Sequence, residues 1–287
     1  YYFSDCTYSG VIIIQDLLDT VKTITFEDYV KWHKLIFQKA FIESLICGNL
    51  LKEEGIEIHE TFVNKFKKVN LFNPLPFSKI KETRMIQLER NKRVIFRKEH
   101  SNLKNHMMSI TFELETNKDL EPLNELLEDF LEPEYYSDLR TNQQLGYTVF
   151  AYGEMVNNAC FFTFVIQSSK LKPNELAFRT YDFLVKKREK LSQLSDEKFE
   201  ELKRGKMAKF KQKFSSLKKQ SRFFFNQICN HEYNFEKREK MVKKIAEITK
   251  NSFIEYYDKI FFEEKRIIEI HLSAKNCFEE NDELILS

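Results

Sequence analysis

The spacing of hydrophobic residues predicts helix, strand and helix at the beginning of the 287-residue chain. Thr25 and Asp28 have the spacing of a capping box, and apolar residues follow from 26 to 37 at helical intervals. A short apolar run at 41–50, FIESLICGNL, indicates a strand that ends in Gly-Asn. A second helix is expected to begin near Lys52, because apolar positions return there at a period of three to four residues.

Residues 71–91 contain Asn-Pro-Leu-Pro and show neither the helical nor the strand period of apolar residues. The periodic pattern begins again after them. The predicted order beyond this linker is two strands, a helix, two strands joined by the loop GEMVNN, four helices and a last strand. The first two strands are predicted at 93–99 and 106–115, the helix at 120–131, and the next two strands at 145–152 and 160–168. The four helices are predicted at 173–194, from 195 through the basic stretch, from there to about 244, and at 251–260. The last strand is predicted at 266–274. This order is typical of an α+β fold, with helices against one face of a mostly antiparallel sheet.

The element order also predicts the domain organisation. Residues 1–70 end in strand and helix, so we expect them to be the C-terminal part of a preceding, similar α+β domain. Residues 92–275 are predicted to form a complete domain, and residues 276–287 a C-terminal tail. A length of 287 residues fits more than one ordinary domain.

Composition and charge exclude some classes of partner. The formal net charge is only +2, from 46 basic and 44 acidic residues, so we expect no nucleic-acid partner. No apolar run approaches the ~18 residues of a membrane span, so no membrane partner is expected. The stretch 203–222 carries nine Lys or Arg and no acid. It is either a patch for an acidic partner or the solvated face of a helix, and both interpretations stay open.

Five cysteines are scattered along the chain without C-x-x-C spacing, at positions 6, 47, 160, 229 and 277. This pattern argues against a disulfide framework and favours a reducing compartment such as the cytoplasm. The sequence starts at Tyr1 without a signal-like segment. We therefore expect the chain to be a fragment or one product of a longer polypeptide.

The histidines do not form a known catalytic or metal motif. The six are His33, His59, His100, His106, His231 and His271. None belongs to an H-E-x-x-H or H-x-x-E-H motif, and G-x-S-x-G, P-loop and G-x-G-x-x-G motifs are also missing. We therefore expect no metal site in this chain and no complete set of catalytic residues.

The segment LRTNQQLGYTVF, residues 139–150, carries an unusual number of hydrogen-bonding groups for a connection between a helix and a strand. These groups either satisfy one another and the nearby backbone, or they bind something outside the chain. In the first case Arg140 pairs with Asp138 or Glu134, and Tyr147 packs in the sheet.

The same segment resembles the R-x-x-x-Q-L-G-Y segment in the C-terminal half of the insulinase family of inverted-zincin metallopeptidases, which includes insulin-degrading enzymes, nardilysins and pitrilysins. Further stretches resemble the family in the same order: FIESLICGNL the end of its third domain, FFTFVIQSSKLKP the next strand, EYNFEKREKMVKKIAEITKNSFIEYY its late helices, and IIEIHLSA its last strand. Together these stretches cover most of residues 1–275. The chain is thus similar to the end of the third domain and nearly all of the fourth.

The resemblance implies the α+β fold of such metallopeptidase halves (LuxS/processing-peptidase-like), with four related domains forming a hinged chamber. In this family the zinc belongs to the N-terminal half, so it would be bound by that half and not by this chain. The implied partners are peptide substrates, the zinc-binding half on the same polypeptide or a partner chain, and possibly a second copy in a homo-oligomer. This chain alone would be inactive.

The resemblance also implies the site residues. Arg140 and Tyr147 match the family's arginine and tyrosine that reach a bound peptide near the scissile bond. Gln144 and Gly146 match further substrate-binding positions, and the missing side chain of Gly146 leaves room for a peptide. Asn142 and Gln143 depart from the charged residues frequent in relatives, so substrate preference stays open.

A different class of function remains as an alternative. The superfamily also contains zinc-less subunits that only hold a substrate or build a complex, so the chain could be a catalytically inactive binding or scaffold subunit. The presence of both Arg140 and Tyr147 favours the peptidase, because a scaffold requires neither residue.

Overall fold

The computed structural model describes residues 14–70, 73–80, 87–100, 104–114, 117–156 and 159–274. These residues form two compact units. Of the described residues, unit 1 takes those from 14 to 80 together with Lys213–Glu236, and unit 2 takes those from 87 to 212 together with those from 237 to 274.

Unit 2 is built on a five-stranded sheet. In spatial order the strands are β3 (Lys92–His100), β7 (Arg266–Ala274), β4 (His106–Glu113), β6 (Ala159–Ser168) and β5 (Thr148–Val156). The pairing of β3 with β7 is parallel, and the other three pairings are antiparallel. β6 lies between β4 and β5, as its continuously apolar sequence predicts. The predicted α+β class with a mostly antiparallel sheet is confirmed.

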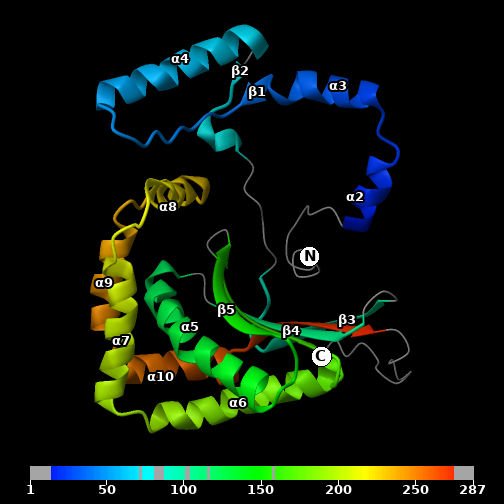
Figure 1. Ribbon diagram of the computed structural model, residues 1–287, viewed down its shortest axis with the longest axis vertical. Coiled ribbons are helices and arrows are strands. Elements are labelled where there is room, and N and C mark those ends of the chain that lie inside the picture. Colours follow the sequence, from blue (N-terminus) through cyan, green and yellow to red (C-terminus); the bar gives the residue numbers. More distant parts are fainter. Residues whose placement is uncertain are drawn as a thin grey trace. The chain divides into compact units, whose positions relative to one another are not determined.

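The helices of unit 2 gather on one face of this sheet, where α5, α6 and α10 lie in Figure 1. The helices are α5 (Glu121–Tyr135), α6 (Pro173–Ser192), α7 (Asp196–Lys211), α9 (Lys237–Glu247) and α10 (Lys250–Asp258), with the short segments η2 (Lys118–Leu120), η3 (Tyr136–Asn142) and η4 (Lys259–Glu263). η3 and η4 are π-helical continuations of α5 and α10. η3 therefore extends α5 into the residues singled out by the sequence.

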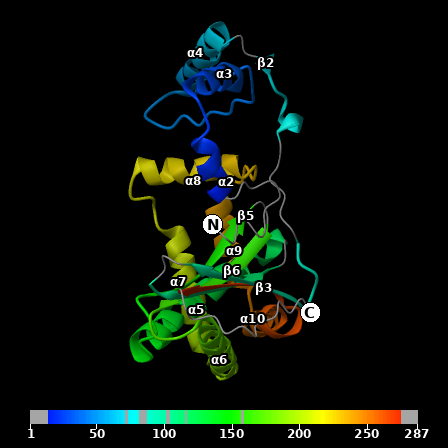
Figure 2. The ribbon, with the colours of Figure 1, turned by 90° about the vertical axis from the view of Figure 1, so that its right-hand side faces the viewer.

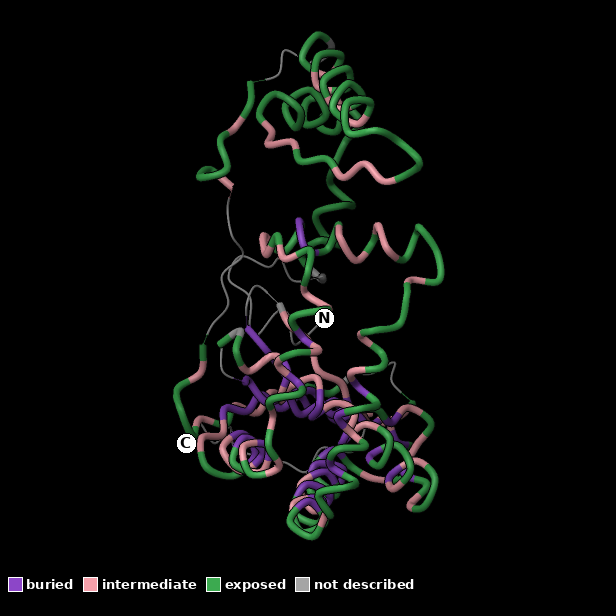
Figure 3. The backbone as a smooth tube through the Cα atoms, turned by 90° about the vertical axis from the view of Figure 1, so that its left-hand side faces the viewer, coloured by how far each residue is buried: buried purple, intermediate pink, exposed green. Residues whose placement is uncertain are grey.

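Phenylalanine fills the core between the sheet and these helices. Phe112 on β4 packs edge-on against Phe164 on β6 and Phe261 on η4, with ring centroids 6.1 and 4.7 Å away. Along each strand the residues of one parity face the helices, as the two-residue period of a strand requires. Figure 3 shows the resulting concentration of buried residues in unit 2. This core fixes the sheet ends from which the candidate site projects.

Unit 1 consists mainly of helices and lacks an extended sheet among its described residues. Its elements are α2 (Ile14–Val21), α3 (Phe26–Ile36), β1 (Lys39–Ala40), α4 (Lys52–Asn70), β2 (Asn73–Pro74), η1 (Phe77–Lys79) and α8 (Leu217–Cys229). β1 and β2 pair in parallel over only two residues. The ring of Phe37, just after α3, packs edge-on against Phe66 of α4, with ring centroids 5.6 Å apart. Both helices can be followed in Figure 2.

Several predicted elements are confirmed and others are wrong. The capping box of Thr25 and Asp28 is formed, with Thr25 Oγ1 accepting from the Asp28 backbone N–H at 3.2 Å. The predicted strand at 41–50 is wrong, because the parallel partner β2 offers hydrogen bonds only to 39–40. The predicted loop GEMVNN is also too long, since β5 and β6 stay paired as far as Val156 and Ala159.

The basic stretch contains a break that the pattern does not predict. α7 ends at Lys211 and α8 begins at Leu217, with Ser216 as its N-cap. The segment from Lys213 to Glu236 groups with unit 1. The domain 92–275 expected from the sequence remains a prediction. Within unit 1 the hydroxyl of Tyr233 donates to Glu43 at 2.6 Å. Side-chain contacts made by residues this distant in sequence leave no local periodic signal.

The other predicted boundaries remain predictions. The division between the units falls at Arg84 and Met85, and the segment 71–91 contains the short β2 and η1. The predicted tail at 276–287 lies outside the described residues.

Candidate functional site

The candidate site lies on the connecting segment, which we define as residues 136–147 between α5 and β5. Its first part, η3, replaces the α-helical bonding of α5 by a wider π-helical turn, closed by Gln143 N–H donating to Asp138 O at 2.9 Å. Such π-helical turns are rare and occur frequently at functional sites. Two side chains fix this turn to the core: Leu139 is fully buried, and the buried Tyr135 is hydrogen-bonded to Thr180 at 2.9 Å.

The second part of the connecting segment turns sharply into β5. Gln144 has a φ of 53°, a backbone conformation that residues other than glycine adopt only rarely. The N–H of the next residue, Leu145, donates back to Leu139 O at 3.0 Å, and Leu145 itself is buried. The Gln144 carbonyl accepts from Lys170 Nζ at 3.3 Å. The turn is thus held by a backbone hydrogen bond within the segment and by a lysine of the loop after β6.

Gly146 allows a close approach between backbone segments. A Cβ at this position would lie 1.8 Å from the carbonyl oxygen of Gln167 on β6, far inside van der Waals contact. The described structure therefore requires glycine here so that the connecting segment can lie against the chain's own β6. The expectation that this glycine leaves room for a peptide remains a prediction.

Arg140 and Tyr147, seven positions apart, are brought together. The Cζ atom of Arg140 lies 5.1 Å from the centroid of the Tyr147 ring, in the geometry of a cation–π contact. The Tyr147 side chain is 86% exposed, although the residues around it are anchored in the core. The guanidinium thus lies against the ring of a largely exposed tyrosine.

The purely structural roles considered for these two residues do not match the described contacts. Within the described part of the chain, Arg140 forms no ion pair with Asp138 or Glu134. Glu134 instead pairs with Lys187 at 2.5 Å and Lys190 at 3.4 Å. Tyr147 precedes β5 and is not packed in the sheet. Both donors consequently remain available to a ligand.

The side-chain amides of the segment do not brace it. Among the described residues, the side chains of Asn142, Gln143 and Gln144 make no hydrogen bond. Asn142 lines an open hollow of about 420 Å³, together with α5 and α6 residues that include Glu134 and Lys187. Backbone bonds and buried anchors hold the segment, which leaves the amides exposed or partly exposed beside Arg140 and Tyr147.

The described residues provide no metal site. In the ranges that the structure describes, no three or more His, Cys, Asp or Glu side chains lie together in a group that could hold a metal ion. The described residues therefore offer no ligand set for a zinc ion. In the same ranges, no helix is both long and apolar enough to cross a membrane.

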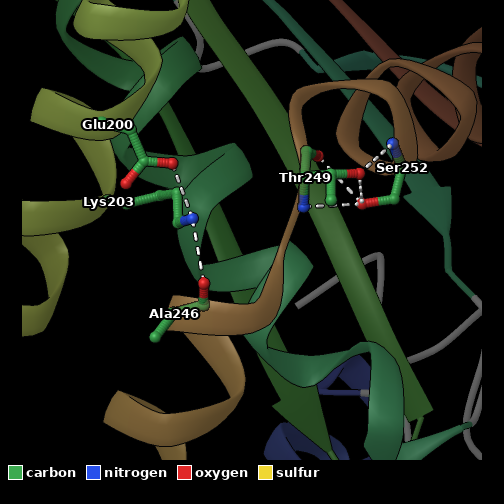
Figure 4. A network of polar contacts seen from close by, with 5 residues as sticks. All are labelled: Glu200, Lys203, Ala246, Thr249 and Ser252. Atoms are coloured by element: carbon green, nitrogen blue, oxygen red, sulfur yellow. Dashed lines mark hydrogen bonds and ion pairs between the residues drawn. The ribbon is translucent and has the colours of Figure 1, made fainter.

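Part of the basic stretch 203–222 has a structural role. Lys203 donates to Glu200 at 2.8 Å and to the carbonyl of Ala246 at 3.0 Å, which ties α7 to α9 (Figure 4). Lys206 pairs with Glu125 at 2.9 Å and Asp129 at 3.0 Å. These lysines neutralise acids of unit 2 and are buried, so they are not available to an acidic partner.

A buried polar centre on β7 was not predicted from the sequence. Glu269 is fully buried and accepts hydrogen bonds from Arg93 Nε at 2.6 Å and from the Tyr181 hydroxyl at 2.5 Å. The ring Nε2 of His271 lies 2.9 Å from its second oxygen. Burial alone would raise the pKa of Glu269, but the bonds to His271, Arg93 and Tyr181 lower it to about 2. The ionised carboxylate of Glu269 thus joins β3, β7 and α6.

The comparisons with known proteins agree with the architecture and the connecting segment: the chain is homologous to insulinase-family peptidases. Residues 126–225 match the family model described as PQQ synthase PqqF-like, C-terminal lobe domain 4. This match includes the whole connecting segment, so the resemblance noted in the sequence is confirmed.

Individual relatives support the same assignment. The chain is 25% identical to the insulin-degrading enzyme of Drosophila melanogaster over 92% of its own length and 27% of the relative. It is 26% identical to the A-factor-processing enzyme of Saccharomyces cerevisiae, over 90% of this chain and 25% of that protein. The crystal structure of pitrilysin superposes with a TM-score of 0.78 at 18% identity, covering 96% of this chain and 28% of pitrilysin. The chain thus spans about a quarter of the length of these relatives.

Proposed function

We propose that this chain is the zinc-free, substrate-contacting part of an insulinase-type zinc metalloendopeptidase, and that Arg140 and Tyr147 contact the peptide at the bond that is cleaved. One observation carries this proposal. Tyr147 is 86% exposed and stacked with Arg140, on a segment that buried contacts on both sides hold in place. An exposed side chain on a firmly held backbone is suited to binding, because the protein needs little reorganisation when a ligand binds.

The chemistry of the pair fits hydrolysis of a peptide bond. Attack on the carbonyl carbon places negative charge on the carbonyl oxygen, and hydrogen-bond donors aimed at that oxygen lower the barrier. A phenolic hydroxyl and a guanidinium are such donors, and arginine also binds a backbone carbonyl in a fixed orientation. Because the two groups lie together, they approach neighbouring carbonyls of one peptide. Gln144 and Gly146 flank the pair and are proposed to contact the same peptide.

The metal chemistry belongs elsewhere in this proposal. Because the described residues contain no ligand set for zinc, we assign the zinc to an N-terminal half, on the same polypeptide or on a partner chain. That half and this chain would together enclose the peptide. The chain by itself is accordingly expected to release no product from a fluorogenic peptide.

The alternative is a superfamily member that binds peptides or holds a complex together without cleaving anything. The anchored pair of donors argues against it, since binding alone does not require a phenol aimed at solvent. The two functions differ in one observable: the complete polypeptide, supplied with zinc, turns over peptides only if it is a peptidase.

The test uses the complete peptidase that contains this stretch. Tyr147→Phe removes one hydroxyl, and loss of a donor to developing charge commonly lowers kcat by roughly 10²–10³, with a much smaller change in KM. Tyr136→Phe is the matched control, because Tyr136 is an exposed phenol on the same connecting segment. It is expected to leave kcat unchanged.

The outcomes separate the interpretations. A selective loss of kcat in Tyr147→Phe, with normal melting, supports the proposed role. Equal turnover by the parent and Tyr147→Phe would show that the hydroxyl takes no part in the reaction. No zinc-dependent turnover in the complete parent protein would favour the scaffold.

A further inference from the structure

We infer that Ser168, at the end of β6, is the positioning residue that sets the direction of Tyr147 and Arg140, an inference that rests on the proposed function. Ser168 is 1% exposed, so it does not contact a bound peptide directly. Its side chain instead contacts the backbone of the connecting segment. Sequence distance conceals this contact, since Ser168 lies 23 residues beyond its partner Leu145.

The hydroxyl of Ser168 uses its donor and both of its acceptor positions. It donates to the carbonyl of Leu145, and it accepts from the backbone N–H groups of Lys170 at 3.0 Å and Leu171 at 3.3 Å. A hydroxyl that accepts from two fixed N–H groups has its single proton directed at the remaining partner. The loop after β6 therefore orients the Ser168 proton toward Leu145.

Leu145 is thereby held at both of its backbone groups. Its N–H donates to Leu139 O at 3.0 Å, and its carbonyl accepts from Ser168. The next residue, Gly146, lies against the Gln167 carbonyl so closely that no Cβ fits between them. Two successive residues before Tyr147 are thus fixed on the end of β6.

Tyr147 depends on these contacts for its position. Within the described residues its side chain makes only the ring contact with Arg140, and it is largely exposed. Its direction is consequently set by the backbone of Leu145 and Gly146. Removing the Ser168 hydroxyl would release the Leu145 carbonyl, so the phenol would sample directions unsuited to catalysis.

The first measurement concerns this chain alone and does not depend on activity. In Ser168→Ala we expect the backbone amide of Leu145 to exchange with deuterium at least about 10-fold faster than in the parent, because the turn that protects it loosens. Ser109→Ala removes another buried hydroxyl of the same sheet, on β4, and serves as the control for a general loss of stability. Unchanged exchange at Leu145 in folded Ser168→Ala would overturn the inference.

The second measurement is a double-mutant cycle in the complete peptidase. Ser168→Ala is expected to lower kcat by about 10-fold or more in the parent background, with little change in KM, and by less than about 3-fold in the Tyr147→Phe background. Gly146→Ala displaces the same backbone by a steric route and should show the same dependence on Tyr147. Gly205→Ala, where an added Cβ meets nothing within 4 Å, is its matched control.

The two measurements distinguish the inference from the proposed function. If Tyr147→Phe itself leaves kcat unchanged, the proposed function fails, and Ser168 then has no reaction for which to position anything. If Tyr147→Phe is impaired but Ser168→Ala lowers kcat equally in both backgrounds, the serine acts independently of Tyr147 and the inference is wrong. The positioning role is established if the Leu145 amide exchanges faster in Ser168→Ala and if Ser168→Ala lowers kcat only where Tyr147 is present.

Discussion

Helices α3 and α5 have the same kind of sequence and opposite surroundings. Both are amphipathic, yet α5 in unit 2 buries Leu126, Leu127 and Leu131 completely, whereas α3 in unit 1 has no buried residue. On α3 the apolar side chains of Phe26 and Trp32 are more than half exposed. Figure 3 shows the contrast as buried tube in unit 2 and exposed tube along α3 and α4.

The difference teaches what an amphipathic pattern specifies. The pattern identifies which face of a helix is suited to burial, and it says nothing about whether the covering surface belongs to the same stretch of chain. Large apolar side chains that lie exposed along one helix are typical of contact sites. We propose that the remainder of a domain related to unit 2 covers α3 and α4.

The largest expected effect comes from paired truncations of phenylalanine. Phe164→Ala removes a fully buried ring from the core of unit 2 and should cost about 3–5 kcal/mol of unfolding free energy. Phe62→Ala on α4 removes a ring that is already 53% exposed, so its cost should stay near 0.5–1 kcal/mol. Urea denaturation of this chain measures both values. Equal costs would mean that unit 1 has a core of its own.

An intermediate effect is expected at the buried carboxylate. The folded pKa of Glu269 is about 2, below its ordinary value of 4.5, so ionised Glu269 stabilises the fold above about pH 4.5. This stabilisation is lost as the pH falls toward 2. Glu269→Gln should lower the unfolding free energy by at most about 3 kcal/mol at pH 7 and flatten its dependence on pH between 4.5 and 2.

Urea midpoints at several pH values check this prediction. The exposed Glu255→Gln on α10 is the control and should leave the profile unchanged. An unaltered acid profile in Glu269→Gln would show that this carboxylate does not contribute to the acid sensitivity of unit 2.

The smallest effect is expected at the candidate site. Tyr147→Phe removes a hydroxyl from an exposed side chain, so the unfolding free energy should change by less than about 0.5–1 kcal/mol. Tyr257→Phe removes a hydroxyl that is buried and donates to Leu184 O at 2.9 Å, and it should cost about 1–3 kcal/mol. Thermal melting of the two variants compares them directly. A larger loss for Tyr147 than for Tyr257 would place Tyr147 in the folding core.

Local patterns predict the elements of unit 2 well because its helices and strands each have one face in a core. The apolar run of β6 follows from neighbouring residues alone, and so does the capping box at Thr25 in unit 1. The wrong strand at 41–50 shows the limit. An apolar run becomes a strand only where a second strand offers hydrogen bonds, and this condition is not local.

The candidate site shows the same limit. The segment around Arg140 and Tyr147 stands out in the sequence because polar groups crowd one connection, but the sequence does not show that backbone contacts brace it. Ser168 was missed because a serine at the end of an apolar strand is commonly a surface residue. Glu269 offered a usable signal: a carboxylate inside an apolar strand requires buried partners. Identifying Arg93 and Tyr181 as those partners requires the fold.

The parallel pairing of β3 with β7 has a consequence for the order of synthesis. Arg93 and its partner Glu269 are 176 residues apart, and β7 is the strand with which β3 pairs in the sheet. At translation rates of roughly 5–20 residues per second, β3 emerges from the ribosome about 9–35 s before that partner exists. During this interval its backbone is open to pairing with other chains. In β3 the apolar run 94–96 is flanked by Arg93 on one side and by Arg97 and Lys98 on the other, so charge repulsion opposes such pairing until β7 arrives.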